Sequence, residues 1–173
     1  MRLLAMVAGA FLIFPSAAPA EAPPKCPSHS NPRGYQRVEQ ANTALVRRFH
    51  DAINRQDWEA ADAFVGAAYR HYVTGTDGFR ALTWDAFKRG NKHLRTAFPD
   101  WRNVIMQTIA ERDKVVVVIE GSGTHRGSIA GEKATGRIAK LPIMIVHQVC
   151  GGKLWADWEA VDTGPLMAAL TAP

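Results

Sequence analysis

Apolar side chains recur at intervals of three and four residues in two stretches of the chain. From about Gln36 to Arg55 they form the stripe of an amphipathic helix: Val38, Ala41, Leu45, Phe49 and Ile53. A second stripe follows Thr83, which can cap a helix, and consists of Trp84, Phe87, Asn91, Leu94 and Phe98. Between them, the Asp57 carboxylate can cap a short helix over Trp58 to Phe64, and Gly66 marks its exit. The pattern predicts three helices, the last of which ends at Pro99-Asp100.

After residue 100 the hydrophobic period changes to two, which is typical of strands. We expect strands at residues 101–111, 114–125, about 137–149 and 153–162, and a helical tail at 165–170. The compact turn candidates Arg112-Asp113 and Cys150-Gly151-Gly152 predict that neighbouring strands pair antiparallel. Before the third helix, Tyr69 to Val73 is expected to be a short extended segment and residues 74–78 a loop.

Helices followed by a long antiparallel meander indicate an α+β domain, a cone-shaped curved antiparallel sheet wrapped around N-terminal helices. Such a cone can enclose a pocket. The run from Val115 to Ile119 is apolar at every position, so both faces of its strand should be covered. The helices would cover one face, and we expect a second copy of the chain, in a homodimer, to cover the other.

The first twenty residues differ from the rest of the chain. Arg2 precedes an apolar run from Leu3 to Phe14, and Ala18-Pro19-Ala20 offers a small-x-small cleavage site, so residues 1–20 are predicted to be a secretory signal peptide. The alternative is an uncleaved anchor, although the run is shorter than the ~20 residues that a spanning helix needs. Residues 21–35 form a Pro-rich arm and 36–173 one domain. We expect an exported protein, periplasmic or secreted, without membrane contact after cleavage.

Composition narrows the class of protein. The 173 residues are 47% hydrophobic, which excludes a disordered tail and fits one core. The net charge of +5 is modest, and its densest cluster, on the helix after Thr83, is explained by a solvated helix face, so no nucleic-acid partner is expected. In an exported chain the two cysteines, Cys26 and Cys150, favour a disulfide; two free thiols are the alternative.

Several short strings follow one another at family-like spacing. They are Leu45-Val46-Arg47-Arg48-Phe49 with Asn54 and Asp57; Ala68-Tyr69-Arg70-His71; Ala97-Phe98-Pro99-Asp100-Trp101; Gly123-Thr124-His125-Arg126-Gly127 with Gly131 and Thr135-Gly136-Arg137; and Gly152-Lys153-Leu154 with Trp158 and Asp162. In this order, over residues 38–170, the chain resembles the SnoaL-like polyketide (ester) cyclase family of the nuclear transport factor 2-like superfamily.

The resemblance implies a usually dimeric, cone-shaped fold whose pocket holds a hydrophobic small molecule without metal or organic cofactor. The founding cyclases close a ring by intramolecular aldol chemistry, with an acidic residue on the last strand as general acid/base. That position falls on Glu159, and the histidine that assists it falls on Ile145, so this partner is missing here. His71 and His125 match histidines that the resemblance places in the pocket and in the Gly-Thr-His string.

The resemblance and residue chemistry together make Glu159, His71 and Asp157 the catalytic candidates. Removal of a proton next to a carbonyl needs a positioned base and a donor for the developing enolate, and an apolar pocket raises the pKa of a carboxyl group. Glu159 and His71 could supply that pair. Alternation places Asp157 on the same face of the last strand as Glu159. That face lines the pocket or is solvent or dimer surface, and the sequence leaves both alternatives open.

His125, Asn91 and Trp158 are the candidates for binding a substrate. Each has a structural alternative, because His125 can fix its Gly-rich turn, Asn91 can lie at the edge of its helix stripe and Trp158 can be core. His147 alternates with Ile143 and Ile145, so it is expected to be a core histidine.

Other chemistries lack their motifs. Ser122 does not stand in a strand-turn-helix elbow, the glycines from Gly121 to Gly136 contain no phosphate loop, and no two histidines have the spacing of a zinc helix. The sequence predicts a domain that binds a hydrophobic carbonyl compound, with cofactor-free cyclase, isomerase or lyase chemistry. The alternative is a non-catalytic small-molecule-binding or protein-interaction module of the same fold.

Overall fold

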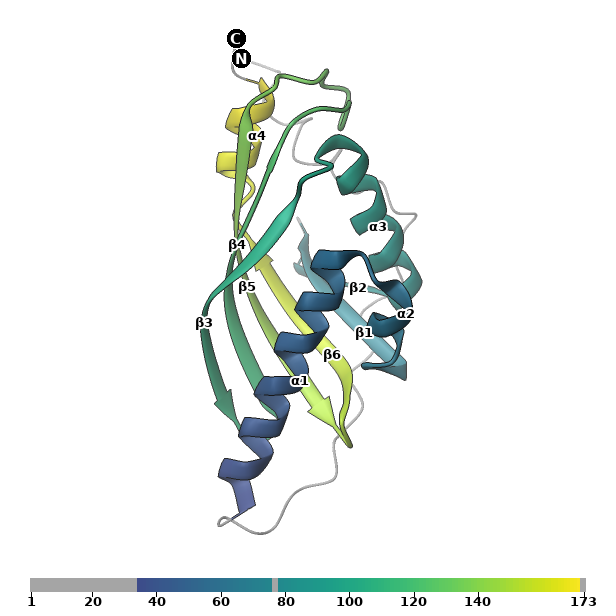
Figure 1. Cartoon of the computed structure of the whole chain (residues 1–173), viewed down its shortest axis with the longest axis vertical. Helices are drawn as coiled ribbons and strands as arrows, with labels where there is room; N and C mark the ends of the chain where they lie inside the picture. The colour runs from purple at the N-terminus through teal and green to yellow at the C-terminus, as the bar shows by residue number, and fades with distance from the viewer. Residues whose placement is uncertain (1–33, 76–77, 172–173) are drawn as a thin grey trace.

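The computed structural model describes residues 34–75 and 78–171, which form four helices and a six-stranded sheet (Figure 1). The helices are α1 (Tyr35–Arg55), α2 (Trp58–Asp62), α3 (Trp84–Ala97) and α4 (Gly164–Thr171). The strands are β1 (Val65–Gly75), β2 (Gly78–Leu82), β3 (Arg102–Glu111), β4 (Lys114–Thr124), β5 (Ile138–Cys150) and β6 (Lys153–Val161). All predicted helices are present, and the caps are too: Asp57 accepts from the Ala60 amide at 3.1 Å and Thr83 from the Ala86 amide at 3.3 Å.

The strands form one curved, unclosed sheet in the order β2-β1-β6-β5-β4-β3. The predicted meander is confirmed, since β3, β4, β5 and β6 pair antiparallel with their sequence neighbours. Two features differ from the prediction. β1 is longer than the expected segment and pairs with β6 in parallel, and the hairpin partner β2 forms where the expected loop ends. β2 is a short edge strand that contains Gly, Arg and Ala, so its sequence carries little strand signal.

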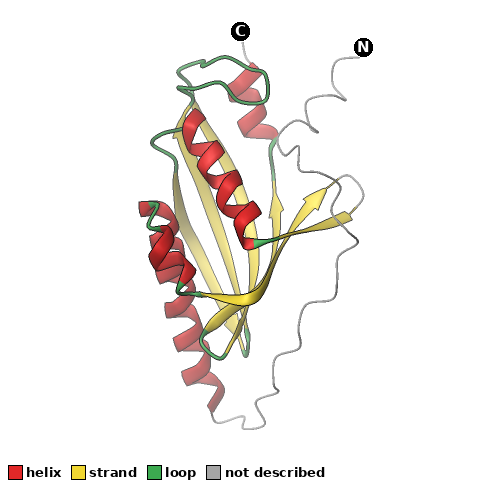
Figure 2. Cartoon of the chain, turned by 90° about the vertical axis from the view of Figure 1, so that its right-hand side faces the viewer, coloured by secondary structure: helices red, strands yellow, loops and turns green. Residues whose placement is uncertain are grey.

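The core lies between the concave face of the sheet and the helices. Figures 1 and 2 show α1, α2 and α3 on this side of the sheet, with α4 at one end against β5. Burial alternates along β4: Val115, Val117 and Ile119 are buried against the core, and the residues between them are half-buried. Leu166 and Leu170 bring α4 into the same cluster.

The convex face of the sheet carries exposed apolar side chains. Ile109 pairs with Val116 and is 54% exposed, and Met144 pairs with Val118 and is 56% exposed. The apolar character predicted for both faces of β4 is therefore present, but this face is only partly covered within the chain. No helix in the described ranges is both long enough and apolar enough to cross a membrane.

Candidate active site

The parallel pairing of β1 with β6 assembles the predicted catalytic residues. It sets His71 opposite Asp157 and Val73 opposite Glu159. Because side chains alternate along a strand, Asp157 and Glu159 share the concave face with His71 and Tyr69. Tyr69, His71 and Asp157 are buried, and the Glu159 side chain is 18% exposed. Two strands that are more than eighty residues apart in sequence thus place one histidine between two carboxyl groups.

Asp157 is the centre of this cluster. The Tyr69 hydroxyl donates to Oδ2 at 2.5 Å and His71 Nδ1 donates to Oδ1 at 2.5 Å, while His147 Nδ1 lies 3.5 Å from Oδ2. Burial alone would raise the pKa of Asp157, but the charge of His71 and the surrounding hydrogen bonds hold that pKa well below its usual range. Asp157 is therefore ionised, and neighbouring side chains already occupy both of its oxygens.

His71 and Glu159 form the open end of the cluster. His71 Nε2 lies 3.9 Å from Glu159 Oε2, and neither atom is hydrogen-bonded to another described residue. Burial alone would lower the pKa of His71, but the Asp157 carboxylate, with help from Glu159, raises it to about 9. Burial raises the pKa of Glu159 above its usual 4.5. At neutral pH an imidazolium donor thus faces a carboxyl group that is more basic than an exposed one.

Two further histidines extend the cluster toward α1. His147 stands opposite Asp157 on β5 and is fully buried. Its Nε2 lies 3.0 Å from Nε2 of His50, a buried residue of α1. Burial, the largest cause, lowers the pKa of His50 to about 3, so His50 is neutral. The polar network therefore runs from α1 through β5 and β6 to β1.

Aromatic rings surround these polar groups. Phe87 of α3 packs edge-on against His71 at 5.0 Å between centroids, and Phe49 of α1 packs against His147 at 6.1 Å. Trp84 contacts both Phe49 and Tyr69 at 5.8 Å. This apolar wall lowers the local dielectric, which strengthens the ionic interactions inside it.

The remaining predicted site residues lie elsewhere. His125 is fully buried beyond the C-terminal end of β4, where it stacks on Phe98 and its Nδ1 accepts from the Thr135 amide at 3.2 Å. Trp158 lies on the convex face of β6, stacked on Tyr72 at 5.4 Å. Asn91 is half-buried on α3, one turn after Phe87, and makes no hydrogen bond to the described residues of the cluster. The structure thus brings together Glu159, His71 and Asp157, and places the three binding candidates apart from one another.

Sequence reasoning did not identify Tyr69, His50 or a polar role for His147. Signals for all three exist in the sequence. Tyr69 is two residues before His71 and so shares its face, and His50 is four residues after Val46 and three before Ile53, on the buried side of α1. His147 was correctly expected to point into the packed interior.

The fold and this geometry can be set beside known proteins. The sequence model of the SnoaL-like polyketide cyclase family matches residues 43–170. The chain belongs to the SnoaL-like polyketide cyclase family. Among curated proteins, no significant sequence match was found.

Solved structures agree on the fold of this SnoaL-like domain. A candidate SnoaL-like polyketide cyclase from Jannaschia sp. CCS1 superposes with a TM-score of 0.70 at 20% identity, covering 85% of this chain and 99% of that one. AclR, a candidate hydroxylase from Streptomyces galilaeus, gives 0.70 at 23% identity, covering 76% and 82%. IdmH, a candidate polyketide cyclase from Streptomyces antibioticus, gives 0.69 at 18% identity, covering 75% and 97%. At these identities the shared property is the nuclear transport factor 2-like fold.

One detail distinguishes this SnoaL-like site from the expectation that the resemblance raised. Glu159, the expected acid/base, has Ile145 opposite it on β5, so the assisting histidine is indeed missing at that register position. A histidine and a carboxylate do face each other two residues further along the same two strands, at His147 and Asp157. No three His, Cys, Asp or Glu side chains among the described residues are grouped so as to hold a metal ion.

Proposed function

We propose that this chain binds a hydrophobic, carbonyl-bearing small molecule and catalyses a cofactor-free cyclase, isomerase or lyase reaction, with Glu159 as general acid/base. One observation carries the proposal: His71 Nε2 and Glu159 Oε2 lie 3.9 Å apart, both uncommitted among the described residues, in front of an Asp157 whose own oxygens are occupied. A donor and a base held this close can act on two atoms of one carbonyl group.

The reaction would begin at the carbon next to the carbonyl. Glu159 takes a proton from this carbon, the C–H electron pair forms the enolate, and His71 Nε2–H donates a hydrogen bond to the enolate oxygen. In a cyclase the enolate carbon attacks a second carbonyl of the same molecule, a C–C bond forms, and the new alkoxide receives the proton that Glu159 holds. In an isomerase the proton returns to a different carbon. No oxidant or reductant is needed.

In this scheme Asp157 is a positioning residue. It contacts His71 and Tyr69 and leaves no oxygen free for a substrate. Its role is to keep the His71 ring charged and turned so that Nε2 faces Glu159.

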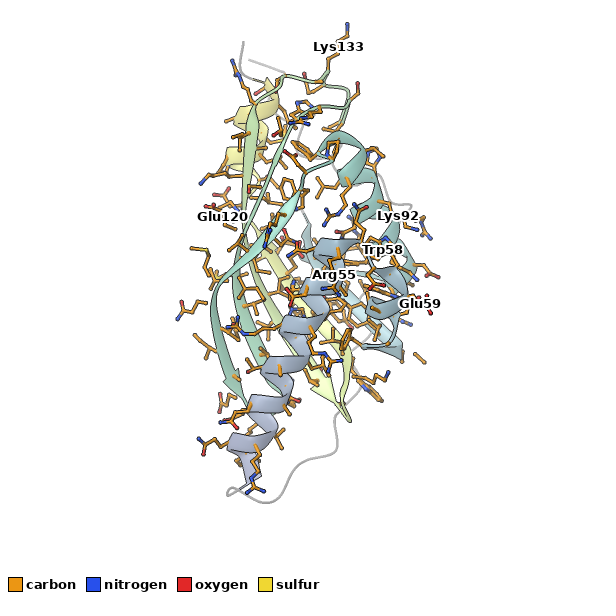
Figure 3. All side chains as sticks on the ribbon, viewed as in Figure 1. Arg55, Trp58, Glu59, Lys92, Glu120 and Lys133 are labelled. Atoms are coloured by element: carbon orange, nitrogen blue, oxygen red, sulfur yellow. The ribbon has the colours of Figure 1, made fainter. Side chains whose placement is uncertain are left out.

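Deuterium exchange tests the proposal before any natural substrate is known. Wild-type protein in D2O is expected to exchange the α-hydrogens of hydrophobic ketones such as acetophenone or 1-tetralone, which NMR detects. Glu159→Gln keeps the side-chain shape without the base, so the exchange rate should fall by about 10²- to 10⁴-fold. The matched control is Glu120→Gln, which removes a carboxylate that pairs with Lys140 on the other side of the sheet (Figure 3) and should leave the rate unchanged.

Equal exchange by Glu159→Gln and wild type would contradict the catalytic assignment. Exchange that is absent from wild type across the whole ketone panel would contradict it as well. Either result would favour a non-catalytic module of the same fold, which binds a small molecule or a protein.

We also propose that the chain forms a homodimer through the convex face of the sheet. The support is its exposed apolar surface, which includes Val104, Ile109 and Met144. Light scattering of the purified protein should give twice the mass of one chain, and Met144→Glu should shift the protein toward the monomer. A monomeric wild type would exclude this dimer.

Export belongs to the same proposal. The predicted signal peptide, residues 21–33 of the Pro-rich arm and Cys26 lie outside the described residues, whereas Tyr35 at the end of the arm already belongs to α1. Cleavage after Ala20 and the Cys26–Cys150 bridge therefore stay predictions. Intact-mass spectrometry of the secreted or periplasmic protein tests both predictions: the mass shows whether residues 1–20 are removed, and its change on reduction shows whether the two cysteines are bridged. A full-length mass without loss of two hydrogens would contradict both.

A further inference from the structure

Two buried imidazoles, those of His71 and His147, face the same carboxylate of Asp157. One positive charge is enough to balance the Asp157 carboxylate, and a second buried cation against the same carboxylate would be costly. The ionisable groups around Asp157 are Tyr69 and His71 from β1, His147 from β5 and Glu159 from β6, with His50 of α1 behind His147. The position of the single charge decides how the site can work.

Distance places the charge on His71. Its Nδ1 is 2.5 Å from Asp157, compared with 3.5 Å for His147 Nδ1, and Glu159 adds a second carboxyl group 3.9 Å from its Nε2. Coulomb attraction grows as distance shrinks, so His71 is the imidazole that carries two ring protons and the positive charge. His147 is then neutral and carries one ring proton.

The location of that one proton follows from the carboxylate. His147 Nδ1 faces Asp157 Oδ2, and a nitrogen lone pair aimed at a carboxylate oxygen is repulsive. The proton therefore lies on Nδ1, and His147 Nε2 has a lone pair. This Nε2 is 3.0 Å from His50 Nε2, a distance that requires one hydrogen between the two nitrogens.

The hydrogen between the two rings must then come from His50. If His50 Nε2–H donates, His50 Nδ1 is left as an acceptor, and Nδ1 is indeed a buried atom without a hydrogen-bond partner. The reverse arrangement would leave His50 Nδ1–H as a buried, unpaired donor and would also aim the His147 lone pair at Asp157. In the first arrangement His50 Nδ1 is an unpaired acceptor, and the His147 Nδ1–H points at Asp157 Oδ2 across 3.5 Å, a long but attractive contact. In the second, an unpaired donor is buried on His50 and a lone pair of His147 faces the carboxylate, so the first arrangement is favoured.

We propose that His50 is a positioning residue: it donates its Nε2 hydrogen to His147 Nε2, blocks that nitrogen from taking a second proton, and so keeps the counter-charge of Asp157 on His71, next to Glu159. The assignment of the hydrogen bond is independent of turnover, whereas its consequence for catalysis rests on the proposed function.

The wild-type protein provides the decisive measurement. Ring-nitrogen NMR of the 15N-labelled chain at neutral pH, with the coupling across the N–H···N bond, identifies which nitrogen carries each hydrogen. We expect hydrogens on His50 Nε2 and His147 Nδ1, and both ring nitrogens of His71 protonated. A hydrogen on His147 Nε2 would overturn the proposal.

A matched pair of variants tests the dependence on His50. His50→Gln keeps an N–H donor that can reach His147, and His50→Leu removes it. In His50→Leu we expect a proton to compete for His147 Nε2, and this second cation lowers the midpoint of the His71 titration by roughly 1 pH unit. In His50→Gln the midpoint should stay near that of wild type. Equal midpoints in the two variants would overturn the proposal.

Two further measurements show whether His50 positions the charge on His71 or only supports the fold. Val46→Ala truncates another buried side chain of α1, one turn earlier, and should leave the His71 midpoint unchanged although it lowers stability. In the ketone exchange assay, the loss of rate on the basic side of the pH profile should begin at a lower pH in His50→Leu than in wild type, because His71 loses its proton at a lower pH. If His50→Leu does not fold, the wild-type spectrum still decides.

The two proposals fail in different ways. If NMR finds the hydrogen on His50 but Glu159→Gln exchanges ketones as fast as wild type, the His50 assignment stands and the proposed reaction is wrong. If the hydrogen lies on His147 Nε2 while Glu159→Gln is inactive, the reaction stands and the role of His50 is wrong.

Discussion

His71 and His125 are both buried histidines, but the groups that contact them differ in charge. His71 lies between the carboxyl groups of Asp157 and Glu159. His125 accepts from the Thr135 amide and stacks on Phe98, and Thr135 Oγ1 in turn donates to the Ala169 carbonyl of α4 at 3.1 Å. One histidine is therefore poised to carry a charge, while the other joins the loop after β4 to α4.

The difference shows that burial alone does not indicate function. His125 is more completely buried than His71, yet all its contacts are with neutral groups and support the fold. His71 has one ring nitrogen held by an ionised partner and the other open toward Glu159. His125 Nε2 is also without a hydrogen-bond partner, so the chemistry of His71 follows from the two carboxyl groups beside its nitrogens.

The largest effect should come from Asp157→Asn. This change leaves the histidines without their buried counter-charge, so the free energy of unfolding should fall by about 3–5 kcal/mol. Urea unfolding measures it. The control is Asp62→Asn, whose carboxylate pairs with Lys88 at the surface and should contribute about 1 kcal/mol or less. Equal losses of unfolding free energy in the two variants would mean that Asp157 is not the buried counter-charge of the histidines.

The next largest effect is a decline in the free energy of unfolding at alkaline pH, which should come from His71 and not from His125. The pKa of His71 is raised from 6.5 to about 9, so its contribution is complete below pH 6.5 and is lost as the pH rises through 9. A shift of this size corresponds to roughly 3 kcal/mol. The pKa values of His50 and Asp157 are lowered, so their contributions are lost as the pH falls, whereas the raised pKa of Glu159 makes its contribution decline as the pH rises above 4.5.

Unfolding by urea at a series of pH values measures this profile. His71→Phe should remove the decline between pH 6.5 and 9, and His125→Phe should keep it. A decline that persists in His71→Phe would assign it to another group.

The smallest effect should come from the His125 region. His125→Phe preserves the stacking on Phe98 but leaves the Thr135 amide without its acceptor, which should cost about 1–3 kcal/mol of unfolding free energy. Ketone exchange per folded molecule should not change, because His125 does not contact Glu159 or His71. If fully folded His125→Phe lost most of its exchange activity, His125 would belong to the catalytic site, and the distinction between His71 and His125 would be wrong.

Much of this fold could be predicted from local patterns. The stripes of α1 and α3, the caps Asp57 and Thr83, and the tight turn at Arg112-Asp113 are local signals that the structure confirms. The parallel pairing of β1 with β6 could not be predicted, because no turn joins these strands and their register depends on packing of the whole sheet.

The candidate site depended on that pairing. Alternation showed that Asp157 and Glu159 share one face, but only the β1–β6 register sets His71 opposite Asp157. The position of His147 depends in addition on an irregularity between Gln148 and Val149, which shifts the β5–β6 register. Chemistry-bearing residues were therefore identifiable in the sequence, whereas the division between an ionised centre and an open end was not.

The central claim is that Asp157 holds His71 as a charged donor in front of an open Glu159. The most direct test is an NMR titration of the ring nitrogens of His71 in the wild-type chain. We expect His71 to keep both ring protons through neutral pH and to lose one only near pH 9. A His71 that titrates near its ordinary value of 6.5, as a neutral ring at physiological pH, would contradict the account.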